Sequence, residues 1–169
     1  MTPTELQNAL AGTGIGDVLI AGFVDRNDDG RVEFCPTYNA YFFECGAMLL
    51  KFGAVPYTGR MRISRVDAVR DELDPDLEPA WASIGTAVLD NSIGPTPLRA
   101  LRLWGVDDNL EMVECDAAQF DLANGQTIFL DPTYHFGIRL GGARQYAIWL
   151  ENLPGDKPKS IDLKLSQGD

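Results

Sequence analysis

The chain has 169 residues, and its composition excludes several classes of protein. A hydrophobic content of 45% and a charged content of 23% are those of a folded domain rather than a disordered chain. The net charge of −11 repels phosphates and anionic lipids, so nucleic acid and membrane surfaces are not expected partners. No apolar run approaches the roughly 20 residues of a membrane helix, and no secretion signal is recognisable, so we expect a cytoplasmic protein.

The length predicts one folded unit. Residues 1–169 suffice for a single domain that buries its own core without covalent cross-links. The three cysteines, Cys35, Cys45 and Cys115, are odd in number and too few for a disulfide framework. We expect them to be small buried hydrophobic residues in a reducing compartment.

The first predicted element is a helix near residues 3–11. Thr2 is suited to cap the helix, and Pro3 is suited to its first position. Glu5 lies three residues after the cap and completes the pattern of a capping box. Gly12 is placed to end the helix.

Apolar and alternating segments predict strands through most of the remaining chain. These segments are 17–24, 31–34, 41–44, 47–52, 60–69, 100–106, 110–115, 119–130, 135–140, 145–150 and 161–165. The alternation shifts near Ser64 and Arg65, which predicts a bulge there. Asn124-Gly125 predicts a tight hairpin turn, and Asp107 to Asn109 predicts another turn.

One further helical segment is expected within residues 74–91. Asp74-Pro75 could cap it, with an inner face made of Leu77, Trp81, Ile84 and Val88. Pro79 and Gly85 weaken this prediction. The fold class expected is therefore α+β: mostly antiparallel sheet built from hairpins and meanders, with an N-terminal helix and one further helical segment.

Two parts of the sequence resemble each other. Residues 40–52 align with residues 118–130, with one gap before Gly46 and Gly125. A duplication would give two related β-meander halves, at about 17–70 and 98–153. Chance similarity is the alternative, because strands that alternate with a period of two look alike.

The stretch FVDRNDDGRVEF, residues 23–34, has two interpretations. Asp25, Asn27 and Asp29, followed by Gly30, match the spacing of the first ligands of an EF-hand calcium loop. Pro36 stands where that loop needs its bidentate carboxylate, and the flanks are strand-like. The competing interpretation is a hairpin turn, with Gly30 supplying the left-handed residue. We favour the turn and keep calcium as the alternative.

The acidic charge predicts a basic partner. Between Arg102 and Arg139 there is no lysine or arginine. The candidate partner-binding residues in this region are Asp107, Asp108, Glu111, Glu114, Asp116 and Asp121. A solvated surface that only keeps the protein soluble would have the same composition.

Catalytic motifs are sparse. His135 is the only histidine, and no cysteine pair has metal-ligand or redox spacing, so no cofactor other than calcium is expected.

We interpret the chain as a non-enzymatic acidic protein-binding module. In size, acidity and lack of catalytic residues it is similar to small immunity or inhibitor proteins that neutralise a toxin or effector, although no specific motif carries that likeness. The alternatives are a calcium-binding structural module and an enzyme of unknown class with a site near His135 and a cysteine.

Overall fold

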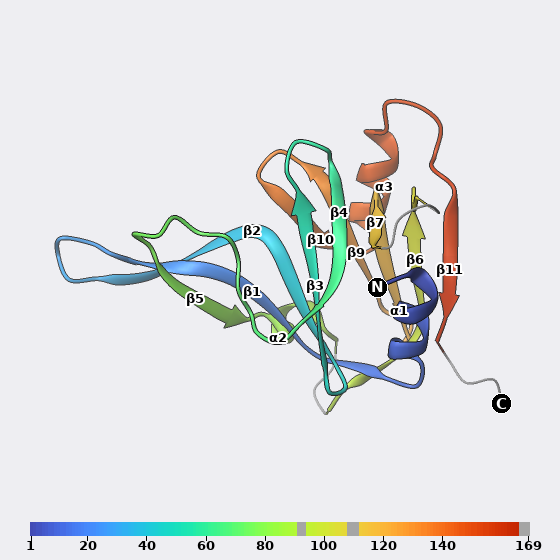
Figure 1. Cartoon of the computed structure of the whole chain (residues 1–169), viewed down its shortest axis with the longest axis horizontal. Coiled ribbons are helices and arrows are strands. Elements are labelled where there is room, and N and C mark those ends of the chain that lie inside the picture. The colour runs from blue at the N-terminus through green and yellow to red at the C-terminus, as the bar shows by residue number, and fades with distance from the viewer. Residues whose placement is uncertain (91–93, 108–111, 166–169) are drawn as a thin grey trace.

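The computed structural model describes residues 1–90, 94–107 and 112–165 (Figure 1). Its helices are α1 (Pro3–Leu10), α2 (Gly85–Val88) and α3 (Ala143–Glu151). Its strands are β1 (Gly14–Arg26), β2 (Val32–Cys45), β3 (Met48–Val55), β4 (Arg60–Val66), β5 (Glu78–Ser83), β6 (Thr96–Trp104), β7 (Val113–Cys115), β8 (Ala117–Leu122), β9 (Thr127–Tyr134), β10 (Gly137–Gly141) and β11 (Ser160–Lys164). None of these helices is long and apolar enough to cross a membrane.

The strands form one open antiparallel sheet, which confirms the predicted sheet type. Its order is β10-β9-β8-β6-β1-β2-β3-β4-β7, with β5 added to β1 and β11 added to β6. The order contains two four-stranded units, which we call meanders: β1 to β4, and β6-β8-β9-β10, from which the intervening strand β7 departs to pair with β4. They meet where Gly14 pairs with Pro97 and Ile15 pairs with Thr96. Common descent of two halves at 17–70 and 98–153 stays a prediction.

The main core lies between the two meanders, which pack against each other. Alternation along β2 sends Tyr41 and Phe43 into this core, while Phe42 packs in a smaller cluster on the other face. The ring of Phe43 lies 4.9 Å from that of Phe120 in the other meander. Helix α1 adds Leu6 and Leu10 to the same core.

Local turn and cap chemistry produces the elements that the sequence predicted best. In α1, the Thr2 hydroxyl accepts a bond from the Glu5 amide at 3.2 Å, and Glu5 accepts one from the Thr2 amide at 2.7 Å. Hairpins turn at Gly30 and Gly125, which have φ values of 81° and 86°. The N-terminal helix and both hairpins are therefore confirmed. The turn predicted at Asp107 to Asn109 lies largely outside the described residues.

The further helical segment predicted within residues 74–91 is confirmed only at α2, and the prediction is wrong for the residues before it. Residues 78–83 form β5 and pair with β1, with Trp81 opposite Ala21, and only the single turn of α2 is helical. Pro79 lacks the amide hydrogen that a helix interior requires. Pairing with β1 satisfies the backbone of this segment instead, so tertiary hydrogen bonding overrides the helical spacing of its apolar residues.

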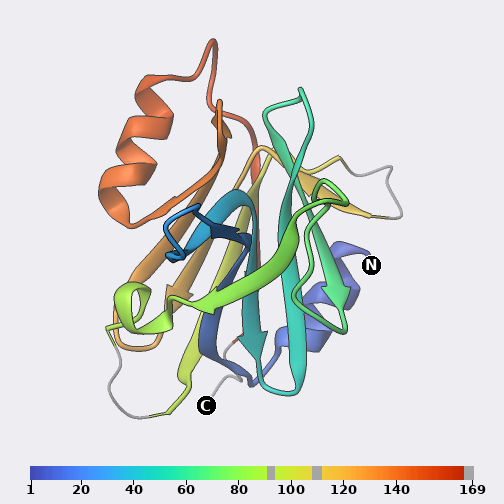
Figure 2. The same ribbon diagram turned by 90° about the vertical axis from the view of Figure 1, so that its left-hand side faces the viewer.

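Residues 145–150, predicted as a strand, lie within helix α3. Tyr146, Trp149 and Leu150 are spaced by three and four residues, so they share one helical face. That face packs on Trp104 and Phe129 at the outer side of the second meander, which α3 covers (Figure 2). Burial of this aromatic cluster requires a helix, because a strand would place Trp149 and Leu150 on opposite faces.

The predicted bulge near Ser64 and Arg65 is absent. Strands β3 and β4 pair without a register shift, and Lys51 stands opposite Ser64. The alternation appeared to slip because both faces of β4 are partly covered. Ile63 faces the main core, whereas Val66 packs against the smaller cluster on the opposite face.

An arm extends from the body of the molecule (Figure 1). It consists of residues 22–36 of the β1–β2 hairpin together with residues 78–81 of β5. At its base the pairing shifts from Tyr41 opposite Ile20 to Pro36 opposite Gly22. The β2 residues left between these pairs form an irregular segment that includes Tyr38, whose φ is 56°.

Candidate functional site

The predicted partner-binding residues are dispersed, and two of them pair with arginines. Arg62 donates to Glu114 Oε1 through Nε at 2.8 Å and through Nη2 at 2.6 Å. Arg60 Nε lies 3.1 Å from Asp116 Oδ1. Burial raises the pKa of Asp116 above its usual value, although the charge of Arg60 opposes this rise.

The other four predicted residues have different surroundings. Asp107 is exposed, and Asp121 is half-buried and accepts a 2.6 Å hydrogen bond from the Gln119 amide. Asp108 and Glu111 lie outside the described residues. Docking of a basic partner on this region stays a prediction, with part of its charge used in internal ion pairs.

The residues predicted as calcium ligands lie at the tip of the arm. Asn27 accepts a bond from the Gly30 amide at 2.9 Å, as a hairpin turn requires. Asp29 Oδ2 lies 3.2 Å from Arg31 Nε, so a cation already faces this carboxylate. Asp25 precedes the turn on β1. No cluster of three or more histidine, cysteine, aspartate or glutamate side chains suited to a metal occurs in the described part of the chain.

The cysteines lie apart from His135. Cys45 and Cys115 are buried, and burial raises the pKa of the Cys45 thiol to about 12. The pKa of Cys35 is also raised, first by desolvation and then by the charges of Asp25 and Glu33. All three thiols therefore favour the protonated, weakly nucleophilic form. His135 lies at a cleft that no cysteine lines.

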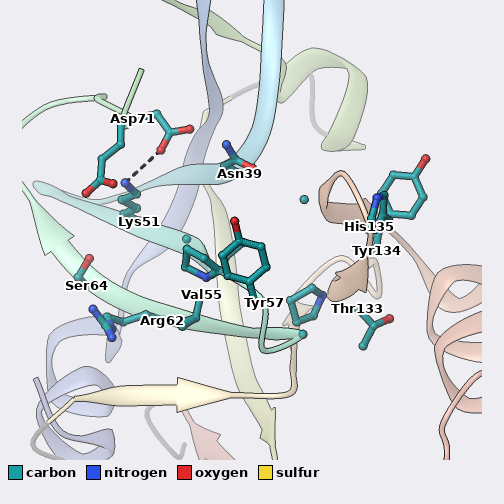
Figure 3. Close-up of a pocket in the computed structure, with 17 residues that line it drawn as sticks. Asn39, Lys51, Val55, Tyr57, Arg62, Ser64, Asp71, Thr133, Tyr134 and His135 are labelled. Atoms are coloured by element: carbon teal, nitrogen blue, oxygen red, sulfur yellow. Dashed lines mark ion pairs between the residues drawn. The ribbon is translucent and has the colours of Figure 1, made fainter. Parts of the chain in front are cut away.

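That cleft has a volume of about 720 Å³ (Figure 3). Strand β3, the β3–β4 turn and the end of β9 form its walls. Its lining includes Asn39, Lys51, Tyr57, Ser64, Thr133 and His135. In Figure 3, Lys51 lies on one side, Tyr134 and His135 lie on the other, and Tyr57 lies between them.

A second hollow of about 530 Å³ lies between the arm and residues 67–77, which we call the crossing segment. Its lining is mainly apolar and includes Val69, Leu73, Leu77, Pro79 and Trp81. Trp81 is 59% exposed although it is the largest side chain there. An exposed tryptophan beside an apolar hollow is typical of an interaction surface.

Asp71 lines both hollows and fixes the crossing segment to the sheet. Its Oδ1 lies 3.6 Å from Lys51 Nζ, and its Oδ2 accepts a 2.8 Å hydrogen bond from the Thr37 hydroxyl. Because Lys51 is on β3 and Thr37 is on β2, one carboxylate joins three segments. Asp71 therefore fixes the position of the crossing segment relative to β2 and β3, beside both hollows.

Negative charge is concentrated around the second hollow. The arm and the crossing segment together carry ten acidic and three basic side chains, a net charge of −7 out of −11 for the chain. The acidic residues fall in two separate stretches of the sequence, at residues 25–33 and 67–78. Pairing of β5 with β1 brings them together, and this pairing was hidden because β5 was predicted as part of a helix.

Comparison with protein-family models, curated proteins and solved structures finds no match. Two surfaces of the molecule combine concave shape with exposed aromatic side chains: the acidic arm with its apolar hollow, and the cleft beside His135.

Proposed function

We propose that the chain is a non-enzymatic, acidic protein-binding module that captures a basic protein, in the manner of an inhibitor or immunity protein. The observation that carries this proposal is the net charge of −7 on the arm and crossing segment, next to an apolar hollow. Long-range attraction would guide a basic partner to this side, and burial of apolar surface would hold it there.

Like charges placed opposite each other in the arm support the proposal. Asp25 pairs with Glu33 across the β1–β2 ladder, although facing carboxylates destabilise a hairpin. A sequence shaped only for folding would favour opposite charges at this pair. We therefore interpret the repulsion as a cost of folding that a cationic partner would relieve.

Trp81 would supply an apolar contact to the partner in addition to the electrostatic attraction. Its neighbours Leu77, just before β5, and Pro79, on β5, continue the apolar surface, and β5 is an edge strand of the described sheet. Tryptophan at the centre of an interface commonly contributes more binding energy than the surrounding contacts. Its exposure on an otherwise acidic face is therefore consistent with a binding role.

The decisive experiment compares two charge reversals of equal size. The tagged chain is used to capture its partner from the source cell, and the partner is identified by mass spectrometry. Association rates are then measured for Asp28, Glu33 and Asp76 changed to lysine, and separately for Asp107, Asp108 and Glu111 changed to lysine. The proposal expects the first variant to associate at least about tenfold more slowly at low salt, with the difference shrinking at high salt.

Three outcomes distinguish the surfaces. A slow arm variant with a normal second variant supports docking at the arm. The reverse result keeps the partner-binding role but moves it to the Asp107 region. An acidic captured protein, or equal rates for both variants and the unaltered chain at every salt concentration, overturns the proposal.

A further inference from the structure

The cleft beside His135 is lined by two exposed aromatic residues, and two more are adjacent in sequence to residues that line it. Tyr57 and Tyr134 line it, Phe136 lies between the lining residues His135 and Gly137, and Tyr38 precedes the lining residue Asn39. Each of these four rings is at least 36% exposed, and they are four of the seven large exposed hydrophobic side chains among the described residues. A concentration of exposed aromatics at one concave place indicates a binding site.

Tyr57 is held in a conformation that folding alone does not explain. Its φ is 63°, a left-handed value that favours glycine or asparagine, and the next glycine, Gly59, has a φ of 66°. The side chain of Tyr57 is fully exposed, so it gains no burial in return for this strain. Backbone strain without a packing benefit is typical of residues kept for function.

The Tyr57 turn is nevertheless well defined. The hydroxyl of Thr58 donates to the Val55 carbonyl at 2.9 Å and accepts from the Arg60 amide at 3.1 Å. On the opposite wall, the guanidinium of Arg139 stacks 3.7 Å from the ring centre of Tyr134. Both aromatic walls of the cleft are therefore fixed before any ligand arrives.

The polar groups of the cleft are electrically balanced. Two cations, Lys51 and Arg62, and two carboxylates, Asp71 and Glu72, line it. Lys51 is paired with Asp71, and Arg62 is paired with Glu114 behind the wall. The lining charges therefore sum to zero and both cations are already paired, so an anionic ligand gains little there.

Neutral hydrogen-bonding groups in the cleft are available to a ligand. Among the described residues, the side chains of Asn39, Ser64 and His135 have no hydrogen-bond partner within the protein. Together these three side chains supply both hydrogen-bond donors and hydrogen-bond acceptors. The site thus offers flat aromatic faces, neutral polar groups and no excess charge.

We propose that this cleft binds a neutral oligosaccharide. A sugar ring presents an apolar C–H face, which stacks on an exposed aromatic ring, and a rim of hydroxyls, which bond with amide, hydroxyl and imidazole groups. Tyr57 and Tyr134 supply the faces, and Asn39, Ser64 and His135 supply the polar partners. This site is separate from the acidic arm, so the proposal of sugar binding does not depend on the proposed protein partner.

The test titrates the whole chain with a panel of neutral tetrasaccharides, β1,4-linked glucose, β1,4-linked N-acetylglucosamine, α1,4-linked glucose and α1,2-linked mannose, and follows amide chemical shifts by NMR. At least one sugar is expected to shift Asn39, Tyr57 and Thr133 in a saturable way. Tyr57→Gly and Tyr57→Asn should each weaken that binding about tenfold or more, while their melting temperatures stay the same or rise because the strain is removed.

A matched control removes an exposed aromatic residue elsewhere. Trp81→Ala, on the arm, should leave the sugar affinity unchanged. The proposal is overturned if no panel sugar gives saturable shifts at millimolar concentration, or if Tyr57→Gly binds sugar as well as the unaltered chain. It is also overturned if a lysine oligomer, and no sugar, shifts the cleft amides, because the cleft would then belong to the surface for a basic protein.

Discussion

The ammonium group of Lys51 lies 3.6 Å from one oxygen of Asp71, whose other oxygen accepts a hydrogen bond from Thr37. The Asp71 side chain is only 7% exposed, so this contact is largely withdrawn from solvent. It connects the crossing segment to two strands of the sheet. Both candidate binding surfaces depend on where that segment lies.

Asp71→Ala is expected to lower the free energy of unfolding by about 1–3 kcal/mol, because it removes the charged partner of Lys51 and the closer of the two acceptors of the Thr37 hydroxyl. Urea unfolding measures this loss. The control is Glu78→Ala, which breaks the exposed Arg26–Glu78 pair and should cost less than about 1 kcal/mol. Equal losses in the two variants would show that Asp71 does not secure the segment.

Truncation to alanine is expected to destabilise the protein strongly at Trp149 and hardly at all at Trp81. Trp149 is 1% exposed and packs on Trp104 and Phe129, so Trp149→Ala should cost about 3–5 kcal/mol in unfolding free energy. Trp81→Ala removes an exposed ring and should change stability by less than about 0.5 kcal/mol. Chemical denaturation of both variants checks the pair, and a large loss for Trp81→Ala would mean that its ring supports the fold.

Acid should weaken the link between β6 and β11. Arg102 donates to Asp162 at 2.6 Å, and this hydrogen bond lowers the pKa of the carboxyl below its usual value. A lowered folded-state pKa contributes stability above the ordinary aspartate pKa of about 3.9, and this contribution is lost as pH falls through the folded-state value. The melting temperature of Asp162→Asn should therefore lie below that of the unaltered chain at neutral pH and converge with it in acid. A constant difference between the two chains over that pH range would refute the assignment.

Millimolar calcium is expected to leave the melting temperature unchanged. Arg31 already faces Asp29 at the tip of the arm, and an ion stabilises a fold only if it binds the folded state more tightly than the unfolded one. Differential scanning calorimetry with and without calcium tests this. A clear rise that disappears in Asp25→Ala would restore the calcium-module hypothesis.

The features that were predicted best from the sequence are those that a few neighbouring residues determine. The Thr2–Glu5 capping box and the turn at Asn124-Gly125 need only local geometry, and both occur as expected. Helix α3 and strand β5 were misassigned because distant partners select their conformations. Trp149 needs the surface made by Trp104, and residues 78–83 need the free edge of β1.

The candidate sites were harder to predict than the elements. The acidic region after Arg102 is continuous in sequence, yet arginines from β4 neutralise Glu114 and Asp116. The acidic arm is made of two stretches that become neighbours only through β5. The strain at Tyr57 had no sequence signal, because Pro56 and Gly59 indicate a turn without fixing which residue adopts the left-handed conformation.

The narrow junction between β1 and β6 has a consequence for how the chain folds. Within each meander the paired strands are close in sequence, so their loops close at little entropic cost. Gly14 and Ile15, in contrast, pair with Pro97 and Thr96, which are distant in the sequence. The two meanders should therefore form early and independently, with the junction closing last. Pulse-labelled hydrogen exchange during refolding would then protect amides in β3 and β9 before that of Leu98, which donates to Thr13 at the junction. Early protection of the Leu98 amide would instead show that the junction is part of the folding nucleus. Formation of the two meanders would then be the slow step.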